Sequence, residues 1–257
     1  MITPRFFHYF PVLVLAGPAR FSWWTLYPYS SYWRRGGHEP EIALAISSIG
    51  GLEGKTAWDL GAHYGIHTLG FSRQVGPRGQ VVAFEPDPAS YRRLQLHLRM
   101  NRLKNVLTFQ AAASERTAEQ TLVVDRGVGA TTSHLPYPGE QLSHASHTLQ
   151  IRCVRIDDLV GAGQIRPPNI IKLDVEGHGG EALAGARNAI QASKPVIVAS
   201  THSPQEAAAI RAVLEPLGYL CERLTHPVSH SDDWAGFQSG ANYLLRFRGD
   251  STKSELS

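Results

Sequence analysis

The sequence predicts an α/β fold whose core is a mostly parallel sheet covered by helices on both faces. Short apolar runs rich in β-branched residues alternate with helical stretches along most of the 257 residues, and this alternation is typical of parallel sheets. Gly-rich or acidic segments follow the first, second and fourth of these runs. Ligands of such sheets bind outside the carboxyl ends of the strands, so we expect a site there.

The predicted elements follow one another through a single domain. Residues 1–37 form an aromatic N-terminal extension, residues 38–250 form the domain, and residues 251–257 form a tail. Strands are predicted at Thr56–Leu60, Gln80–Phe84, Val106–Gln110, Asn169–Leu173, Pro195–Ser200, Tyr219–Leu224 and Asn242–Phe247. Helices are predicted at Glu39–Ile49, Ile66–Val75, Ala89–Asn101, Gly180–Ala192 and Pro204–Leu217. The crossovers between parallel strands should be right-handed.

Two regions interrupt this alternation. Thr121–Val124 and Thr148–Val154 are predicted to pair as a hairpin-like insertion, and the stretch between them, near residues 125–147, is predicted to be a polar loop. A second loop is predicted near residues 225–240, where His, Asp and aromatic residues gather. Loops beside a site often select the substrate, and ordinary surface loops are the competing interpretation.

The composition excludes some classes of protein. Hydrophobic residues make up 42% of the chain and charged residues 18%, which allows a sizeable core and argues against a disordered chain. The net charge is only +3 and the basic residues are scattered, so no nucleic-acid partner is expected. Cys153 and Cys221 form no CxxC pair, so a reducing, cytoplasmic location is the default.

The N-terminal extension carries an apolar run, Phe6–Ala16, which is followed by Trp23, Trp24, Tyr27, Tyr29, Tyr32 and Trp33. The run is too short to span a bilayer, contains Pro11, and lacks the charged start of a signal peptide. We expect this segment to pack on the domain or to line the substrate entrance. The alternative is weak contact with a membrane surface, where the protein would be peripheral, because Trp and Tyr suit the depth of lipid headgroups.

A glycine-containing turn follows the first predicted strand. Gly61 comes directly after the strand and Gly65 four residues later, and glycine allows a sharp turn and a close approach of ligand. The turn is not GxGxxG, because His63 and Ile66 stand in it. A dinucleotide pyrophosphate needs that close backbone contact, so the departure favours S-adenosyl-L-methionine, which has no phosphate. Asp59 suits its ammonium group or an ordered water. A glycine turn without a ligand is the competing interpretation.

An acidic residue, Glu85, ends the second predicted strand, 24 positions after Gly61. A carboxylate in this place can accept hydrogen bonds from both hydroxyls of an adenosine ribose. Pro86 and Pro88 shape the turn that follows, and Asp87 is predicted to cap the next helix. A role for Glu85 in capping alone is the less favoured interpretation.

A third segment places charged groups after the fourth predicted strand. Asp174, Glu176 and His178 follow closely on one another, and groups so near can shift one another's pKa. Lys172 could pair with one carboxylate. Asp, Glu and His are also metal ligands, but this spacing is not diagnostic of a metal. His202, after the fifth strand, should lie on the same rim as His178. A lone His is more often structural than catalytic, but this position on the rim gives the two roles equal weight.

Together these segments resemble the FkbM family of methyltransferases. The resemblance rests on Ala57–Leu69 (AWDLGAHYGIHTL), Val81–Pro88 (VVAFEPDP) and Ile171–Ala186 (IKLDVEGHGGEALAGA). It implies a Rossmann-like class I methyltransferase fold, with a seven-stranded, mostly parallel sheet whose last strand is antiparallel. It also implies S-adenosyl-L-methionine as the cofactor and O-methylation of a hydroxyl on a sugar, glycan, lipid or secondary metabolite.

The resemblance assigns roles to individual residues. The methionine end of the cofactor would be surrounded by Asp59, Gly61, Ala62, His63, Gly65 and His67. Glu85, with Pro86 beside it, would hold the ribose, and Ala111 and Ala112 would lie near the adenine. Asp174, Glu176 and His178 would face the reaction centre, with Asp174 also near the cofactor.

Two positions depart from the family's pattern. The family often has Glu directly after the His of its third motif, where this chain has Gly179. It often has Glu two residues before the His that follows the fifth strand, where this chain has Ser200. Two acids that could serve a metal are missing, so no metal is expected.

The expected reaction is an in-line displacement, in which the protein aligns an acceptor oxygen and removes its proton. His178 is the first candidate for general base because an imidazole titrates near neutral pH, and Asp174 or Glu176 would orient it or act as base directly. His202 is the second candidate. The expected partner is a small-molecule or glycan acceptor.

Two other functions compete with methyl transfer. One is an NAD(P)-dependent oxidoreductase on a related sheet, against which the missing GxGxxG argues. The other is a non-catalytic cofactor-binding protein that keeps the same fold.

Overall fold

The computed structural model describes residues 9–26, 34, 40–127, 130–136, 146–224 and 234–249. A seven-stranded sheet lies at its centre with the order β12-β13-β11-β10-β3-β4-β5. Its strands are β3 (Thr56–Leu60), β4 (Gln80–Phe84), β5 (Val106–Phe109), β10 (Ile170–Leu173), β11 (Val196–Thr201), β12 (Tyr219–Leu224) and β13 (Ala241–Phe247). Neighbouring strands are parallel except at β13, which is antiparallel to both β11 and β12. The predicted sheet, with its last strand antiparallel, is confirmed.

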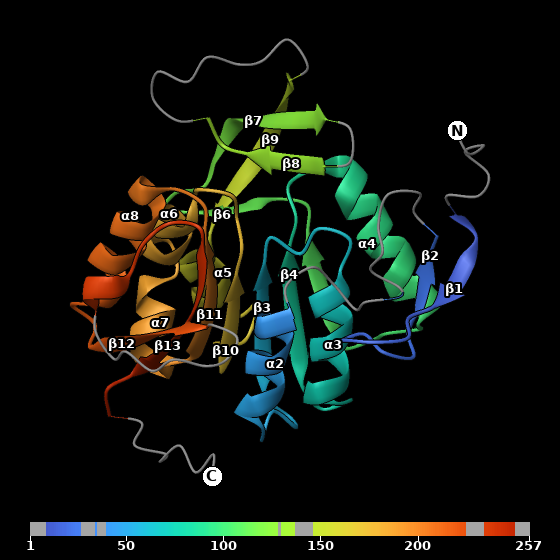
Figure 1. Ribbon diagram of the computed structural model, residues 1–257, viewed down its shortest axis with the longest axis horizontal. Coiled ribbons are helices and arrows are strands. Elements are labelled where there is room, and N and C mark those ends of the chain that lie inside the picture. Colours follow the sequence, from blue (N-terminus) through green and yellow to red (C-terminus); the bar gives the residue numbers. More distant parts are fainter. Residues whose placement is uncertain are drawn as a thin grey trace.

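Helices cover both faces of this sheet (Figure 1). They are α2 (Pro40–Ile49), α3 (Ile66–Val75), α4 (Pro88–Met100), α5 (Ile156–Gly161), α6 (Gly179–Ala184), α7 (Arg187–Ser193) and α8 (Pro204–Leu214). Alternate residues of a strand point to opposite faces, and β3 shows the result. Trp58 and Leu60 pack in the cluster that includes residues of α5 to α8, whereas Ala57 packs with residues of α2 and α3. Every residue of β3 is therefore buried.

One predicted helix is wrong. The stretch Gly180–Ala192 forms two short helices, α6 and α7, instead of one. The carboxylate of Asp157 accepts hydrogen bonds from the backbone N–H groups of Asn188 and Ala189 at 3.0 and 2.9 Å, which caps α7 as a separate helix. Gly185 lies between the two helices, and a Cβ there would sit 1.8 Å from the carbonyl oxygen of Ser114. A tertiary contact thus breaks a pattern that looks continuous in the sequence.

A second sheet of four strands follows β5. It is built from β6 (Ala112–Ser114), β7 (Ala118–Gly127), β8 (Ala130–His134) and β9 (Ser146–Arg155), in the order β6-β9-β7-β8. The predicted pairing of the two insertion strands is confirmed, since β7 and β9 run antiparallel. The stretch expected to be a loop instead contains β8 and the end of β7, while residues 137–145 lie outside the described part. Figure 1 shows this sheet above the end of the large sheet where its parallel strands finish.

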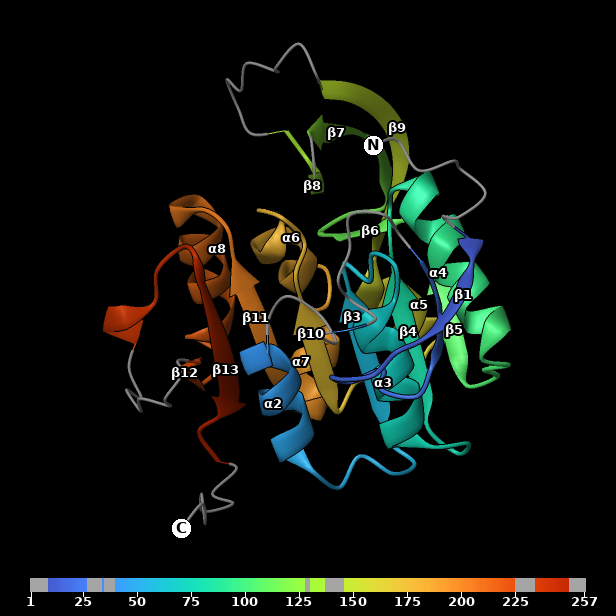
Figure 2. The same ribbon diagram turned by 45° about the vertical axis from the view of Figure 1, so that its right-hand side comes forward.

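The N-terminal extension packs on the domain over its described residues. Its strands β1 (Pro11–Leu13) and β2 (Trp23–Thr25) form an antiparallel hairpin, which lies beside α4 in Figure 1 and in Figure 2. Val14, Ala19 and Trp24 are fully buried in a cluster with residues of α3 and α4. The expectation that this segment packs on the domain is confirmed for the hairpin, and Tyr27, Tyr29, Tyr32 and Trp33 lie outside the described residues. No helix within the described ranges is long and apolar enough to cross a bilayer.

Candidate active site

The turn after β3 needs glycine at two positions. Gly61 has a φ of +80°, and a Cβ on it would lie 1.8 Å from the carbonyl oxygen of Asp174. Gly65 has a φ of +91°, and a Cβ on it would lie 2.4 Å from a methyl group of Leu94. Only glycine adopts such angles without strain. The two glycines therefore let the turn approach both the end of β10 and helix α4.

A buried lysine joins the turn to the ends of β3 and β10. The Nζ atom of Lys172 lies 3.2 Å from Oδ2 of Asp174 and 3.6 Å from Oδ1 of Asp59. It also donates a hydrogen bond to the carbonyl oxygen of Gly61 at 3.2 Å. Oδ2 of Asp59 accepts a hydrogen bond from Thr68 at 2.5 Å. Asp59 is fully buried. Its carboxylate contacts Lys172 and Thr68 in the interior and is not exposed to solvent.

The buried carboxylate of Glu85 ties the end of β4 to the same turn. It accepts hydrogen bonds from the backbone N–H groups of His63 at 2.7 Å and of Asp87 at 2.9 Å. Burial raises the pKa of Glu85 to about 8, although these two hydrogen bonds oppose the rise. Asp87, not Glu85, caps α4, because its side chain accepts from the backbone N–H groups of Ala89 and Ser90. Capping therefore does not explain Glu85.

The remaining residues assigned to the cofactor line the turn and the end of β5. Ala62, Ala111 and Ala112 are small and buried, and Pro86 is half-buried between Glu85 and Asp87. The ring of His63 stacks on that of Tyr64, with centroids 3.7 Å apart. Burial and the charge of Lys172 lower the pKa of His67 to about 4, so its ring is neutral at pH 7. Its Nδ1 is buried without a hydrogen bond among the described residues.

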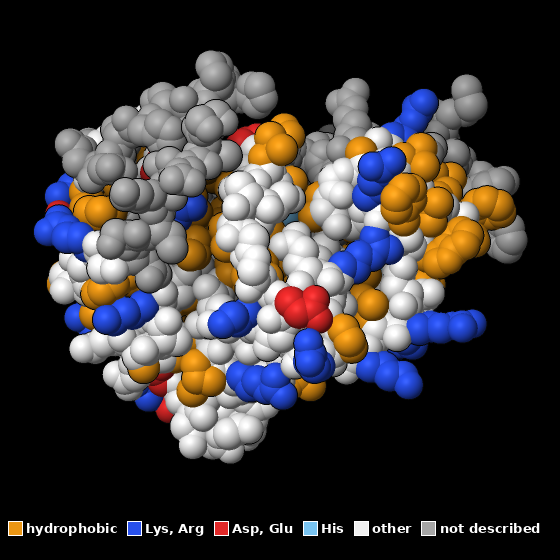
Figure 3. Space-filling view, turned by 90° about the horizontal axis from the view of Figure 1, so that it is seen from below, with side chains coloured by type: hydrophobic (Ala, Val, Ile, Leu, Met, Phe, Trp, Pro, Cys, Tyr) orange, Lys and Arg blue, Asp and Glu red, His pale blue; other side chains and the backbone are white. Residues whose placement is uncertain are grey.

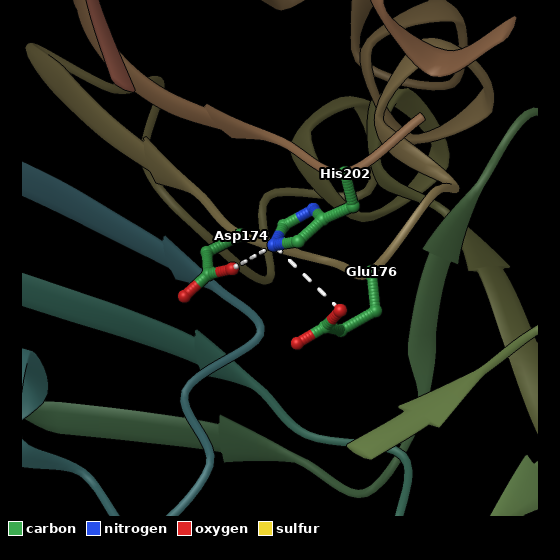
Figure 4. Close-up of side chains that lie close together, drawn as sticks. All are labelled: Asp174, Glu176 and His202. Carbon is green, nitrogen blue, oxygen red and sulfur yellow. Dashed lines mark ion pairs between the residues drawn. The ribbon is translucent and has the colours of Figure 1, made fainter. Parts of the chain in front are cut away.

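Three side chains from the ends of β10 and β11 meet at one point (Figure 4). The Nε2 atom of His202 lies 3.2 Å from Oδ1 of Asp174 and 3.6 Å from Oε2 of Glu176. On the other side of the ring, Nδ1 lies 3.2 Å from Oε2 of Glu206. His202 was expected on the same rim as His178, and the structure places it beside the two acids that precede His178 in the chain.

His202 is charged at neutral pH. Burial alone would lower its pKa, but hydrogen bonds to Asp174 and Glu206, with the charge of Glu176, raise the pKa of His202 to about 10. Both ring nitrogens face carboxylate oxygens, an arrangement that satisfies an imidazolium, which donates from both. The role of His202 as a second general base stays a prediction, and its raised pKa argues against that role, because a base must accept a proton that this ring already holds.

The two acids beside His202 differ in their tendency to take up a proton. Burial alone would raise the pKa of Asp174, but Lys172 and His202 hold that pKa well below its usual range. Burial raises the pKa of Glu176 above its usual value, and its side chain stays 38% exposed. Neighbouring carboxylates with separated pKa values commonly take different roles in a reaction. Of the two acids, Asp174 therefore favours its anionic form and Glu176 takes up a proton more readily.

Glu206, on the first turn of α8, is a site residue that the sequence analysis missed. Its Oε1 accepts hydrogen bonds from the backbone N–H groups of Gly177 and Gly179 at 3.1 and 3.0 Å, and its Oε2 accepts from the backbone N–H of His202 at 2.7 Å. The side chain is fully buried. The signal was present as Ser203 followed three residues later by Glu206, which is the pattern of a capping box. Ser203 does cap the helix, but Glu206 turns to the site.

The structure explains why residue 179 has no side chain. A Cβ on Gly179 would lie 2.9 Å from Oε1 of Glu206 and 2.8 Å from a methyl group of Ile210. A larger residue would displace the carboxylate that holds both loops. Ser200, the other departure, is buried, and its Oγ has no hydrogen-bond partner among the described residues.

His178 lies apart from the three clustered side chains. Its Nε2 is 3.0 Å from the hydroxyl oxygen of Ser114, and its Nδ1 is 3.6 Å from Oε2 of Glu181. The expectation that Asp174 or Glu176 orients His178 is therefore wrong. The backbone turns at Gly177, which has a φ of +96°, and this turn directs His178 to the second sheet. Burial lowers the pKa of His178, which favours the neutral form of its ring.

The cluster has the atoms that a divalent cation would need. Ligand atoms of Asp174, Glu176 and His202 all lie within 4.8 Å of one another. A cation would require His202 to release its proton, because only a neutral imidazole binds metal. His202 and Lys172 supply two positive charges against the four carboxylates of Asp59, Asp174, Glu176 and Glu206, so the group keeps a net negative charge.

Comparisons with known proteins show the family of the chain. A family model described as "Methyltransferase FkbM domain" matches residues 59–221. Hexuronic acid methyltransferase AglP of Haloferax volcanii is 28% identical over 153 residues, which are 57% of this chain and 56% of AglP. Methyltransferase 1 of Beauveria bassiana is 24% identical over 141 residues, which are 49% of this chain and 56% of that protein. The matched part of this chain thus spans about half the length of these curated relatives.

A solved structure is also similar. Methyltransferase FkbM from Methylobacillus flagellatus has a TM-score of 0.47 at 20% identity, over 74% of this chain and 43% of that chain.

Proposed function

The chain belongs to the FkbM methyltransferase family, and from this premise we propose that it transfers the methyl group of S-adenosyl-L-methionine to an acceptor hydroxyl. The observation that carries the proposal is the cluster of Asp174, Glu176 and His202 beside the glycine turn, at the carboxyl ends of the strands, where such sheets bind ligands. A relative named as a hexuronic acid methyltransferase supports a sugar or glycan as the acceptor.

The residues of the turn fit this cofactor. S-adenosyl-L-methionine, when bound, supplies an electrophilic methyl group on its sulfonium. Glu85 offers two carboxylate oxygens that each accept one backbone hydrogen bond and keep a lone pair for a further donor. Two ribose hydroxyls would provide those donors. Their hydrogen bonds would stabilise the charged carboxylate of Glu85 against the burial that raises its pKa. Ala111 and Ala112 leave room for the flat adenine ring, and Gly61 keeps the turn free of side chains.

Glu176 is the group best suited to remove the acceptor's proton. A general base needs a pKa that approaches the working pH. Asp174 is held as an anion by Lys172 and His202, and His202 is already protonated. Glu176 is half-exposed, with a raised pKa. His178 is the second candidate, but its Nε2 is engaged with the buried hydroxyl of Ser114.

Asp174 and His202 have a different task in this proposal. The negative carboxylate and the positive imidazolium form a fixed pair of charges beside Glu176. Fixed charges that are already oriented stabilise a transition state without further reorganisation. They would align the acceptor hydroxyl towards Glu176 and limit its rotation, which is the larger part of the catalysis expected for a displacement on a reactive methyl group.

A ligand-binding experiment tests the cofactor. We expect S-adenosylhomocysteine to raise the thermal unfolding temperature, and NAD and NADP to leave it unchanged. Glu85→Ala should lose that stabilisation, whereas Asp158→Ala, which removes an exposed carboxylate on α5, should keep it. Stabilisation by NAD or NADP instead would favour an oxidoreductase. Binding of S-adenosylhomocysteine without transfer to any acceptor would favour a non-catalytic binding protein.

A further inference from the structure

The N-terminal hairpin carries most of the exposed apolar surface. Eight large hydrophobic side chains are exposed among the described residues, and all but Leu44 and Leu107 lie between residues 9 and 23. The six in the hairpin are Tyr9, Phe10, Leu13, Leu15, Phe21 and Trp23, with exposed fractions from 37% to 61%. Apolar residues gathered in this way on a folded protein mark a contact site.

The exposed side chains sit on a fixed platform. Trp24 is fully buried, and its ring stacks on that of His97, with centroids 3.7 Å apart. The backbone of Trp23 exchanges two hydrogen bonds with the side chain of Asn101, at 2.8 and 2.7 Å. Pro18 packs against Gly70 of α3, where a Cβ would lie 2.6 Å away. One side of the hairpin therefore packs in the hydrophobic core. The apolar residues on its other side are exposed and do not contribute to that core.

The two segments that build this platform, residues 9–26 and residues 88–114, are basic. Neither residues 9–26 nor residues 88–114 include Asp or Glu. These two segments, which join at Asn101, contain Arg20, Arg92, Arg93, Arg99, Arg102 and Lys104. The guanidinium of Arg20 lies over the ring of Phe21 at 4.5 Å, and that of Arg93 over the ring of Tyr9 at 4.7 Å. Figure 3 shows hydrophobic and basic side chains side by side on the right of the molecule, where the hairpin lies.

We infer that this hairpin docks the protein on the surface of an anionic membrane. Trp and Tyr favour the depth of lipid headgroups, and Phe and Leu enter the boundary with the acyl chains. Arginine and lysine around the apolar residues would pair with lipid phosphates, and each adds to the attraction of an anionic leaflet. Because both segments are basic and lack acidic residues, an anionic surface should attract them more strongly than a neutral one. The inference is independent of the methyl-transfer reaction.

Sedimentation with lipid vesicles tests this inference on the full chain. We expect the protein to bind vesicles that contain phosphatidylcholine and phosphatidylserine, and to bind phosphatidylcholine alone at least about tenfold more weakly. Binding should weaken as salt rises, because salt screens charges at a surface. Equal binding to both kinds of vesicle, or binding to neither, would overturn the proposal.

Matched variants separate the hairpin from the rest of the surface. Leu15→Ser with Phe21→Ser should reduce vesicle binding about tenfold, because both apolar side chains are lost to the lipid. Leu44→Ser with Leu107→Ser removes the two exposed apolar side chains elsewhere and should not change binding. Arg20→Gln with Arg102→Gln should reduce binding to anionic vesicles, whereas Arg78→Gln should not. The affinity for S-adenosylhomocysteine checks that each variant is folded.

Two further outcomes would contradict the membrane surface. If the control pair lowered vesicle binding as much as the hairpin pair, the hairpin would not be the docking element. If the wild-type chain were a dimer in solution and the hairpin pair converted it to a monomer, with no lipid binding by either, a second copy would cover the platform instead.

Discussion

Glu206 holds His202 at two atoms, because one carboxylate oxygen accepts the backbone N–H of His202 at 2.7 Å and lies 3.2 Å from the ring Nδ1. The other oxygen accepts from Gly177 and Gly179. A single buried acid thus joins the loop after β10 to the loop after β11. Carboxylates that orient a histidine in this way set both its ring position and its protonation, so Glu206 is a positioning residue for the whole cluster.

Removing the charge of Glu206 should lower the pKa of His202. In Glu206→Gln, the amide keeps one acceptor oxygen but loses the negative charge that favours the imidazolium. We expect the His202 pKa, measured by NMR titration, to fall below that of the wild type, and turnover at neutral pH to fall about tenfold. Glu215→Gln, which alters an exposed acid near the end of α8, should change neither. A wild-type pKa in Glu206→Gln would contradict the positioning role.

Stability should depend on pH through His202. The folded pKa of His202 is about 10 and the unfolded pKa is about 6.5. A raised folded pKa means that the contribution of His202 to stability is full below about pH 6.5 and is lost as pH rises through about 10. Urea unfolding at several pH values should show the wild type losing its advantage over His202→Gln across this window. An advantage that grew with pH would contradict a charged His202.

Glu176→Gln is expected to lower turnover about 100-fold, since general bases contribute about 10²–10⁴-fold. The affinity for S-adenosylhomocysteine should stay unchanged. In the wild type, the rate should fall at low pH as Glu176 takes up a proton, at a pKa above its usual value of 4.5. A large loss in His178→Gln with little loss in Glu176→Gln would assign the base to His178 instead.

Gly61→Ala should destabilise the fold by about 3 kcal/mol or more, because it combines a positive φ with a clash against the carbonyl of Asp174. Gly54→Ala is the matched control. Gly54 has a similar φ of +72°, but no atom lies within 4 Å of the added Cβ, so only the backbone strain of about 1–2 kcal/mol remains. Urea unfolding measures both variants. Equal losses would show that the contact with Asp174 does not constrain the turn.

Chelation of divalent cations should leave turnover unchanged. A cation would compete with the proton of His202 for the same oxygen atoms of Asp174 and Glu176. We expect equal initial rates with and without EDTA. Loss of activity in EDTA that is restored by magnesium or manganese would show that the cluster holds a metal.

Much of the sheet was predictable from the sequence. β3, β4 and β12 begin and end where they were predicted. β3 and β4 are largely apolar and buried, a pattern that marks strands clearly, whereas β12 is only partly buried. The insertion strand β8 was missed, because its residues Ala130–His134 are mostly small or polar and show no apolar alternation. The helix predicted across Gly185 was wrong, because Asp157, distant in the sequence, supplies a new cap.

The site was predictable in its location and not in its charges. Parallel strands bring their carboxyl ends to one edge, which places Asp174, Glu176 and His202 together without further information. The protonation of His202 could not be predicted, because it depends on three carboxylates from two segments, the loop after β10 and helix α8. Glu206 was missed because its sequence pattern indicates a helix cap, and only the packed structure shows the side chain reaching the loop after β10.

Transfer of a labelled methyl group tests the central proposal most directly. The wild-type chain and Glu176→Gln would each be incubated with methyl-labelled S-adenosyl-L-methionine and a fractionated cell extract. We expect label in a carbohydrate-containing fraction, where mild base should not remove it because it is an ether on a hydroxyl. Labelling by Glu176→Gln should be about 100-fold slower. Labelling that mild base removes would indicate an ester on a carboxylate. Labelling of no fraction, by a chain that binds S-adenosylhomocysteine, would contradict the proposed methyl transfer itself.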